Sequence, residues 1–318
     1  MPQVECPICE YPYAELRYQL SDRFFATAPD RFNLYQCRSC GLFFQRLQEL
    51  PGELDRFYPP GYWWNGSGRL SPLEKSYREW MIRHDQLKYV LACLSGPQCR
   101  LLDIGCGAGT FVKLAAGQGL DAFGLEQSRE AAELAARELP DKIFHASEQD
   151  LIERAEKFDL ITLFHCLEHL PQPLDYLKKI KELLNERGKL ILQVPNVASF
   201  QARLMGPRWY GLDCPRHIFN YSAFSLMLLL GRAGYRIHNV RHFSLRDNAA
   251  ALLSSLFAPL DPMSQKVRLL RKKGKSNSPG LALKEAVYLS LLPLAQIFAL
   301  VEAGFGRGGT VTIHASKE

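Results

Sequence analysis

The chain has 318 residues, 47% of them hydrophobic, and a formal net charge of +6 at pH 7. Such a chain can bury a substantial core, which excludes a disordered polymer, and a charge this diluted does not by itself indicate nucleic-acid binding. The first ten residues have neither a basic start nor an apolar run, so we expect no signal peptide and a cytoplasmic location. Nine cysteines in a chain too long to need a disulfide scaffold predict reduced thiols.

Two Cys-x-x-Cys pairs lie near the N-terminus: Cys6 with Cys9, and Cys37 with Cys40. Each pair lets two thiolates reach one ion, so the four predict a structural zinc ribbon within residues 1–50. Zinc ribbons can also bind nucleic acid, but this segment has five arginines, no lysine and six acidic residues, without a basic patch. A zinc-ribbon nucleic-acid-binding protein is therefore an alternative of another class, and we expect no nucleic-acid partner.

Residues 51–98 are expected to form a connector and an N-terminal helix. The segment 57–68 is rich in Pro, Gly and aromatic residues, and Ser71 begins a capping-box pattern for a helix to about Leu94. From residue 99 to residue 318, short apolar strands alternate with longer helices, which predicts an α/β fold with a doubly wound, mostly parallel sheet. The expected strands are residues 100–104, 121–126, 142–146, 158–164, 188–194, 235–243 and 309–315. The expected helices begin at residue 110 and cover 128–139, 173–186 and 222–234.

An insertion at about residues 247–308 interrupts this alternation. Its first part, 262–284, has no acidic residue, and six basic residues lie between positions 266 and 275: Lys266, Arg268, Arg271, Lys272, Lys273 and Lys275. The apolar run 286–301 follows and is shorter than a membrane span. Two interpretations stay open. The run is a buried or dimer-forming helix, or residues 262–301 attach the protein to an anionic membrane, which would place it peripherally on the inner membrane face.

A glycine-rich turn, "LLDIGCGAGTF" at 101–111, follows the first strand of the α/β region. Asp103 ends the strand, and Gly105, Gly107 and Gly109 allow a tight turn that a ligand can approach before a helix begins. A dinucleotide fingerprint would need glycine where Thr110 stands, which disfavours a nicotinamide-dependent oxidoreductase. Glu126 ends the second strand, where an acid can hydrogen-bond a ribose diol.

These residues resemble the class I S-adenosylmethionine-dependent methyltransferases over 100–245 and 309–315, and a bacterial subset with N-terminal zinc ribbons that often acts on sugars or polysaccharide precursors. The resemblance implies a seven-stranded sheet with a reversed last hairpin. It also implies that the glycine turn binds the cofactor together with Asp103 and Glu126. In the family an acid near the adenine follows the third strand, and Ser147 is the candidate here.

The heptapeptide "FHCLEHL" contains His165, Glu168 and His169 in the pattern of inverted zinc proteases. Those enzymes need both histidines on one continuous helix, whereas prolines follow at positions 171 and 173. In the methyltransferases this loop lies beside the sulfonium. The resemblance therefore makes the three residues part of the cofactor shell or active site.

His217 in "LDCPRHIFNYS" is the candidate base, because a neutral imidazole suits proton removal near pH 7. Arg216 and Asp213 are expected to orient the acceptor, and Tyr62 is expected to close the site as a lid. Two alternatives stay open: His217 caps the helix that begins near Ser222, or His169 is the base.

The sequence thus predicts methyl transfer from S-adenosylmethionine to an oxygen or carbon of a sugar or polysaccharide precursor. The partner would be a small-molecule or glycan-precursor substrate. The alternative acceptor is a lipid or quinone precursor, O-methylated at a membrane surface.

Overall fold

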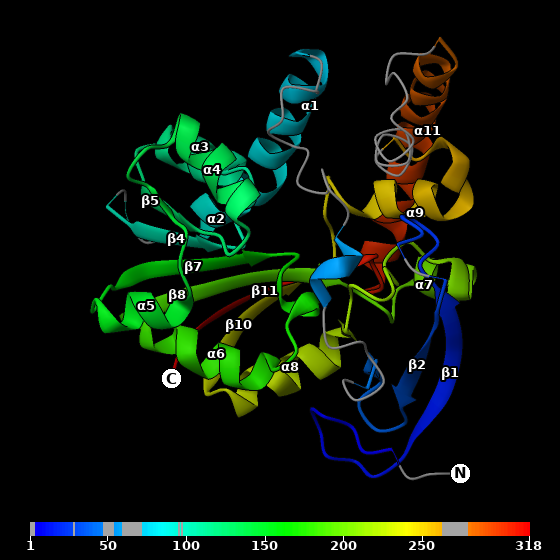
Figure 1. Cartoon of the computed structure of the whole chain (residues 1–318), viewed down its shortest axis with the longest axis horizontal. Helices are drawn as coiled ribbons and strands as arrows, with labels where there is room; N and C mark the ends of the chain where they lie inside the picture. Colours follow the sequence, from blue (N-terminus) through cyan, green and yellow to red (C-terminus); the bar gives the residue numbers. More distant parts are fainter. Residues whose placement is uncertain are drawn as a thin grey trace. The chain divides into compact units, whose positions relative to one another are not determined.

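The computed structural model describes residues 4–27, 29–46, 54–58, 72–94, 96, 98–262 and 279–318. Tyr62, Ser71 and the basic run 266–275 lie outside these residues. The chain divides into two compact units (Figure 1). Unit 1 comprises Met1–Tyr62, Pro195–Leu226 and Arg241–Val311, and unit 2 comprises Trp63–Val194, Met227–Val240 and Thr312–Glu318. The cysteine-rich segment therefore groups with two segments that are distant in the sequence.

Unit 2 is built on a seven-stranded sheet of order β10-β11-β8-β7-β4-β5-β6. The pairs β4–β5, β4–β7, β5–β6 and β7–β8 are parallel, which confirms the predicted α/β class with a mostly parallel sheet. The strands are β4 (Arg100–Ile104), β5 (Asp121–Leu125), β6 (Ile143–Phe144), β7 (Phe158–Phe164), β8 (Leu184–Pro195), β10 (Tyr235–Arg241) and β11 (Thr310–Lys317). Since the parallel strands end at one edge, the loops that follow β4, β5 and β7 share that edge.

Helices cover the strands of unit 2 where the apolar spacing predicts them, and one short helix is additional. The helices are α1 (Pro72–Ile82), α2 (Lys88–Cys93), α3 (Thr110–Ala116), α4 (Arg129–Glu138), α5 (Glu148–Glu153), α6 (Pro173–Glu182) and α8 (Ala223–Arg232). A π-helical turn, Arg83–Leu87, joins α1 to α2. The Ser128 side chain caps α4 by accepting a hydrogen bond from the Ala131 N–H. Helix α5 is too short for its apolar spacing to have predicted it.

Unit 1 contains a four-stranded sheet of order β1-β2-β3-β9. Its strands are β1 (Ala14–Ser21), β2 (Arg31–Cys37), β3 (Phe43–Phe44) and β9 (Phe219–Asn220). All three pairs are antiparallel, and the last joins Phe44 to Phe219. The unit also holds α7 (Phe200–Met205), α9 (Asn248–Leu256) and α11 (Pro279–Gly304). The sheet of the cysteine-rich segment is therefore completed by a strand from much later in the chain.

A buried polar network fixes the C-terminal end of α11 within unit 1. Glu302 is fully buried and accepts hydrogen bonds from Gln201 Nε2 at 2.6 Å and from the Gly309 N–H at 2.9 Å. Burial raises the pKa of Glu302, although these donors act in the opposite direction. Trp209 Nε1 donates to Gln201 Oε1 at 3.1 Å. Because a buried carboxylate needs such donors, this network holds the end of α11 in one position.

Candidate active site and candidate metal centre

The glycine turn after β4 has three left-handed positions, as its sequence pattern requires. Gly105, Gly107 and Gly109 have φ values of 71°, 54° and 74°. A Cβ at Gly105 would lie 3.1 Å from Cys166 Sγ, and one at Gly109 would lie 3.1 Å from the Ala135 Cβ. At Gly107 a Cβ would meet no atom of the described residues within 4 Å beyond its chain neighbours. The turn is therefore packed against protein at its two ends, and Gly107 faces open space.

Two buried carboxylates, Glu126 and Asp103, lie at the ends of the strands beside the glycine turn. Glu126 Oε2 accepts a hydrogen bond from the Gly107 N–H at 2.9 Å, and Oε1 accepts one from the Ser128 N–H at 2.8 Å. Burial raises the pKa of Glu126 despite these donors. Asp103 Oδ1 accepts a hydrogen bond from Thr162 Oγ1 at 2.7 Å. Sequence analysis missed Thr162, because its partner lies on a neighbouring strand.

The loop after β7 brings His165 and Glu168 together. His165 has a φ of 55°, and its Nδ1 lies 3.4 Å from Glu168 Oε1. The Glu168 side chain is 1% exposed. His169 ends the 3-10 turn Leu167–His169, and the next helix begins only at Pro173. His165 and His169 therefore do not share one continuous helix, which agrees with the exclusion of an inverted zinc protease.

Ser147 serves as the N-cap of α5. Its hydroxyl accepts from the Asp150 N–H while the Asp150 carboxylate accepts from the Ser147 N–H, which is a capping box. The next residue, Glu148, is 8% exposed, and its Oε1 lies 3.9 Å from Lys179 Nζ. Among the described residues its Oε2 has no hydrogen-bond partner. Sequence analysis missed Glu148, although the Ser-x-x-Asp spacing could have predicted the helix that buries it.

His217 lies in unit 1, on the loop before β9. Its Nδ1 is 2.8 Å from the Gly211 carbonyl oxygen, and because a carbonyl oxygen only accepts, Nδ1 donates in this hydrogen bond. The helix that begins at Ala223 is not capped by His217, because the Ser222 hydroxyl accepts from the Ser225 N–H at 3.0 Å. The capping alternative for His217 is therefore wrong.

Arg216 is not placed to orient an acceptor, contrary to our expectation. Its side chain is fully buried and lies 2.8 Å from Asp22 Oδ1. It also donates to Asp213 Oδ2 at 2.9 Å and to the Phe57 carbonyl oxygen at 3.0 Å. Burial lowers the pKa of Arg216, but the two carboxylates outweigh that effect and raise it. The guanidinium is thus part of a buried ion-pair network, and the same network holds Asp213.

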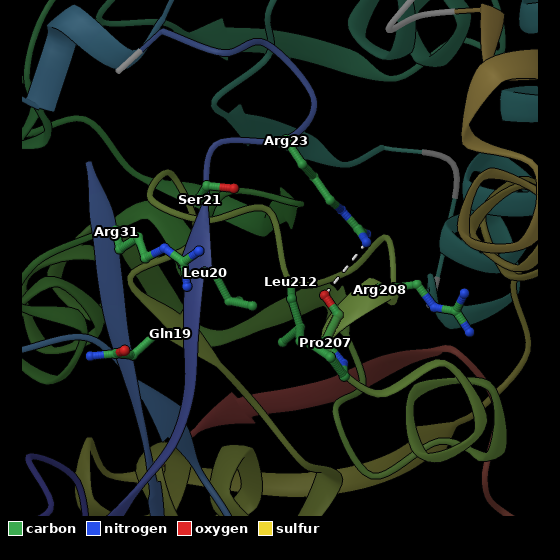
Figure 2. A pocket seen from close by; sticks show the side chains of 8 residues that line it. All are labelled: Gln19, Leu20, Ser21, Arg23, Arg31, Pro207, Arg208 and Leu212. Atoms are coloured by element: carbon green, nitrogen blue, oxygen red, sulfur yellow. Dashed lines mark hydrogen bonds between the residues drawn. The ribbon is translucent and has the colours of Figure 1, made fainter. Parts of the chain in front are cut away.

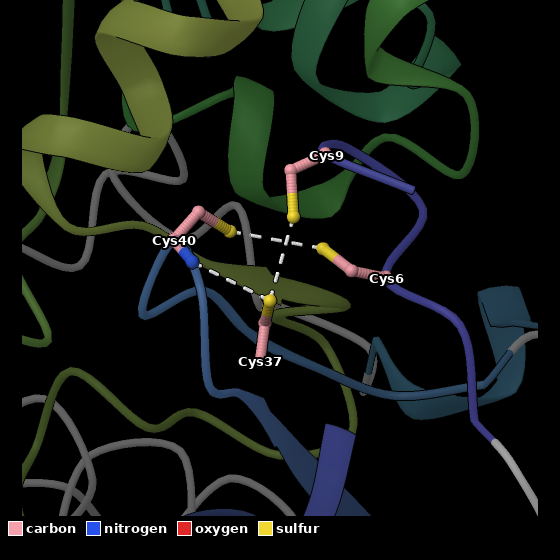
Figure 3. A group of neighbouring side chains, drawn as sticks. All are labelled: Cys6, Cys9, Cys37 and Cys40. Atoms are coloured by element: carbon pink, nitrogen blue, oxygen red, sulfur yellow. Dashed lines mark hydrogen bonds between the residues drawn. The ribbon is translucent and has the colours of Figure 1, made fainter. Parts of the chain in front are cut away.

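The four predicted metal ligands gather in unit 1 (Figure 3). Cys6 Sγ lies 3.7 Å from Cys40 Sγ, and Cys9 Sγ lies 3.5 Å from Cys37 Sγ. All four sulfurs lie within 4.8 Å of one another. Four sulfurs around a tetrahedral zinc ion, each at about 2.3 Å, are separated by about 3.8 Å. The Cys6–Cys40 and Cys9–Cys37 separations are therefore close to those expected around a zinc ion.

The protonation of the cluster also suits a cation. A hydrogen bond from the Cys40 thiol lowers the pKa of Cys6 to about 5, whereas the same contact raises the pKa of Cys40. One thiolate of the pair is thus stabilised by the proton that the other retains. A cation at the centre would allow both to ionise.

A cavity of about 200 Å³ in unit 1 lies between the β1–β2 strands and the 207–212 loop (Figure 2). Its eight lining residues include Arg23, Arg31 and Arg208 and no carboxylate. Arg23 Nη2 donates to the Trp209 carbonyl oxygen at 2.8 Å. Burial lowers the pKa of Arg23 to about 10, and the charge of Arg208 acts in the same direction. The positive lining suits a carboxylate or phosphate group.

The fold and the glycine turn together define a class I S-adenosylmethionine-dependent methyltransferase. A family model described as a methyltransferase domain matches residues 66–240, more than half of the chain, and the chain belongs to that family.

Named relatives agree with this class. A ubiquinone biosynthesis O-methyltransferase of Aliivibrio fischeri is 29% identical over 172 residues, which cover 51% of this chain and 71% of the relative. One from Cereibacter sphaeroides is 28% identical over 195 residues, covering 55% and 76%. A solved structure from Galdieria sulphuraria, named as a candidate sarcosine dimethylglycine methyltransferase, has a TM-score of 0.50 at 17% identity and covers 83% of this chain and 98% of its own. That likeness shows the fold alone.

Proposed function

We propose that this methyltransferase holds S-adenosylmethionine at the glycine turn and methylates a hydroxyl oxygen of a lipid or quinone precursor. The open space at Gly107 is the observation that carries the cofactor site, because it is the one glycine of the turn whose missing side chain leaves room for a ligand. When bound, S-adenosylmethionine supplies an electrophilic methyl group. The chain's own residues then align the acceptor and remove its proton.

The proposed cofactor residues have separate tasks. Glu126 already accepts two backbone N–H groups, and a carboxylate with about four acceptor positions can accept a ribose diol as well. Gly105 and Gly109 shape the turn, while Asp103 supports it through Thr162. In the proposal, Ser147, His165 and Glu168 complete the cofactor shell. Glu148 joins them as a buried carboxylate whose Oε2 has no described partner.

The acceptor is proposed from the relatives. Their printed name, ubiquinone biosynthesis O-methyltransferase, supports the lipid or quinone alternative better than the sugar precursor that the sequence resemblance favoured. Such an acceptor has an apolar tail and resides in a bilayer, so this proposal also requires contact of the protein with a membrane surface. The sugar or polysaccharide precursor remains the competing acceptor class.

For proton removal we propose His217, whose ring is oriented by the hydrogen bond between its Nδ1 and the Gly211 carbonyl oxygen. His169 is the rival base, and Tyr62 is proposed as a lid.

We also propose that Cys6, Cys9, Cys37 and Cys40 bind one structural zinc ion, as the sulfur separations support.

An acceptor panel tests the proposal. The full chain is incubated with S-adenosylmethionine that carries a labelled methyl group, together with prenylated phenols in detergent, nucleotide-activated sugars, or bulk transfer RNA. We expect label only in the prenylated phenol, and none with the Glu126→Ala variant, which lacks the proposed diol contact. Label in the sugars alone would restore the first expectation. Label in the RNA would favour a nucleic-acid role for the ribbon.

A further inference from the structure

Helix α11 presents apolar side chains on its exposed surface. Six of them are between 48% and 67% exposed: Leu283, Leu289, Leu294, Ile297, Leu300 and Val301. Between residues 286 and 301 the sequence has no charged residue. A surface helix normally exposes charged and polar residues and keeps its apolar stripe for the core. Over residues 286–301 the exposed face of α11 is therefore mostly apolar and has no charged side chain.

Two polar side chains of α11, Tyr288 and Gln296, form hydrogen bonds with other parts of unit 1. The Tyr288 hydroxyl donates to the Ala250 carbonyl oxygen at 3.1 Å, and Gln296 Nε2 donates to the Leu245 carbonyl oxygen at 2.5 Å. Tyr288 also packs with α9, which lies beside α11 in unit 1 (Figure 1). Lys284 and Ser290 are exposed, and the side packed on α9 includes the apolar residue Ala295. Both sides of α11 are therefore mostly apolar, whereas a helix that borders water usually has one polar side.

We propose that this face of α11 docks on an anionic membrane surface. By length and composition, Leu283–Gly304 of α11 is long and apolar enough to cross a membrane, which corrects the expectation drawn from the shorter run 286–301, and 22% of its most apolar window is buried. One side of α11 is already packed on α9. The helix therefore lies along the membrane interface with its exposed face in the acyl boundary, and it does not cross the bilayer.

The sequence beside α11 provides the charge that selects this occupant. In the sequence, six basic residues fall between residues 266 and 275, a run outside the described residues, and Lys284 and Glu285 stand between this run and the uncharged stretch. Basic side chains next to an inserted apolar face attract anionic head groups. A second copy of the chain could cover the apolar face, but it would bring a second basic run of the same sign. The charge pattern therefore complements a lipid surface better than it complements another copy.

This inference depends on α9, α11 and the sequence around them, and it does not depend on the proposed acceptor or on the cofactor site. Flotation of the full chain tests it, with phosphatidylcholine vesicles that contain or lack phosphatidylglycerol. We expect recovery with the anionic vesicles and little recovery with the neutral ones.

A double variant, Leu294→Glu with Ile297→Glu, tests the face itself. Both side chains are exposed, so the fold should tolerate the change, while recovery should fall at least about tenfold, which corresponds to about 1.4 kcal/mol. Leu16→Glu on β1 is the matched control, since Leu16 is 50% exposed on another element. It should float like the unchanged protein. Should thermal melting show that the double variant is unfolded, Leu294→Gln with Ile297→Gln replaces it.

Three results would overturn the proposal. In the first, the unchanged chain stays in the soluble fraction in the presence of anionic vesicles. In the second, the folded double variant floats as well as the control. The third result is a dimer in solution that the double variant converts to a monomer, without flotation of either, which would identify a second copy as the occupant. Binding of S-adenosylhomocysteine, measured on the same samples, reports separately whether the cofactor site holds.

Discussion

Replacing Gly107 with Ala should damage cofactor binding far more than it damages the fold. A residue with a Cβ in the left-handed region costs about 1–2 kcal/mol. Among the described residues, and apart from the two chain neighbours of Gly107, no atom lies within 4 Å of the new methyl group, so this strain is the expected cost. At about 2–4 °C per kcal/mol for a domain of this size, the melting temperature should fall by roughly 2–8 °C. The methyl group occupies the proposed ligand space, so the dissociation constant for S-adenosylhomocysteine should rise at least about tenfold.

The chain offers a matched control for this experiment. Gly119 has a φ of 88°, and a Cβ there would also meet nothing within 4 Å. It precedes β5, whereas the glycine turn follows β4, and these strands are parallel. Gly119 therefore lies at the opposite edge of the sheet from the proposed site. Gly119→Ala should lower the melting temperature by a similar amount and leave cofactor affinity unchanged. Equal calorimetric affinities in the two variants would refute the placement of the cofactor at the turn.

Three further predictions concern the metal, an ion pair and the base. Protein purified without chelator should contain one zinc ion per chain. The Cys9→Ser variant should lose this ion, while Cys93→Ser, outside the cluster, should keep it. Metal analysis that finds no zinc in the unchanged protein would contradict the zinc site. Burial acts to raise the pKa of Asp22, but the hydrogen bonds and charge of Arg216 lower it overall. The Asp22–Arg216 pair therefore stabilises the fold above about pH 4, the usual range of an aspartate. This contribution is lost as the pH falls through the lowered pKa of Asp22. Asp22→Asn should therefore cost about 3 kcal/mol of unfolding free energy at neutral pH and much less in acid, as measured by urea denaturation, and an equal cost at both pH values would argue against the pair. His217→Ala should lower turnover by about 10²–10⁴ with cofactor affinity intact, and full turnover would transfer the role of base to His169.

The strands and helices of unit 2 could be predicted because each is marked by residues that are close together in the sequence. Strands such as Arg100–Ile104 and Phe158–Phe164 are short apolar runs bounded by turns, and helix α4 carries its own N-cap in Ser128. Strand β9 has only two residues, and its partner β3 lies more than 170 residues earlier. No local pattern marks such a pair, so the sequence could not show that the cysteine-rich segment joins residues 195–226 in one unit.

The site residues divide in the same way, because some are marked by local sequence spacing and others depend on contacts between distant parts of the chain. The spacing of the glycines and cysteines is dictated by a turn and by a metal ion, and spacing is visible in a sequence. Arg216 reads as an exposed binding residue beside His217, yet its charge pairs with Asp22, which is 194 residues away. The partner of a buried charge decides whether that charge is structural or functional, and tertiary packing supplies the partner.

The features that distinguish this chain lie outside the region shared with its family. The family match runs from residue 66 to residue 240, whereas the cysteine cluster precedes it and α11 follows it. Relatives that match about half of this chain therefore inform cofactor binding more directly than the choice of acceptor.

A lipid acceptor and a membrane-docked α11 support each other, because a bilayer would then supply the substrate at the surface where the protein resides. A freely soluble sugar acceptor would leave the exposed apolar face of α11 without a part in catalysis. Flotation and the acceptor panel should consequently give linked answers, and a chain that floats but methylates only soluble sugars would separate the two proposals.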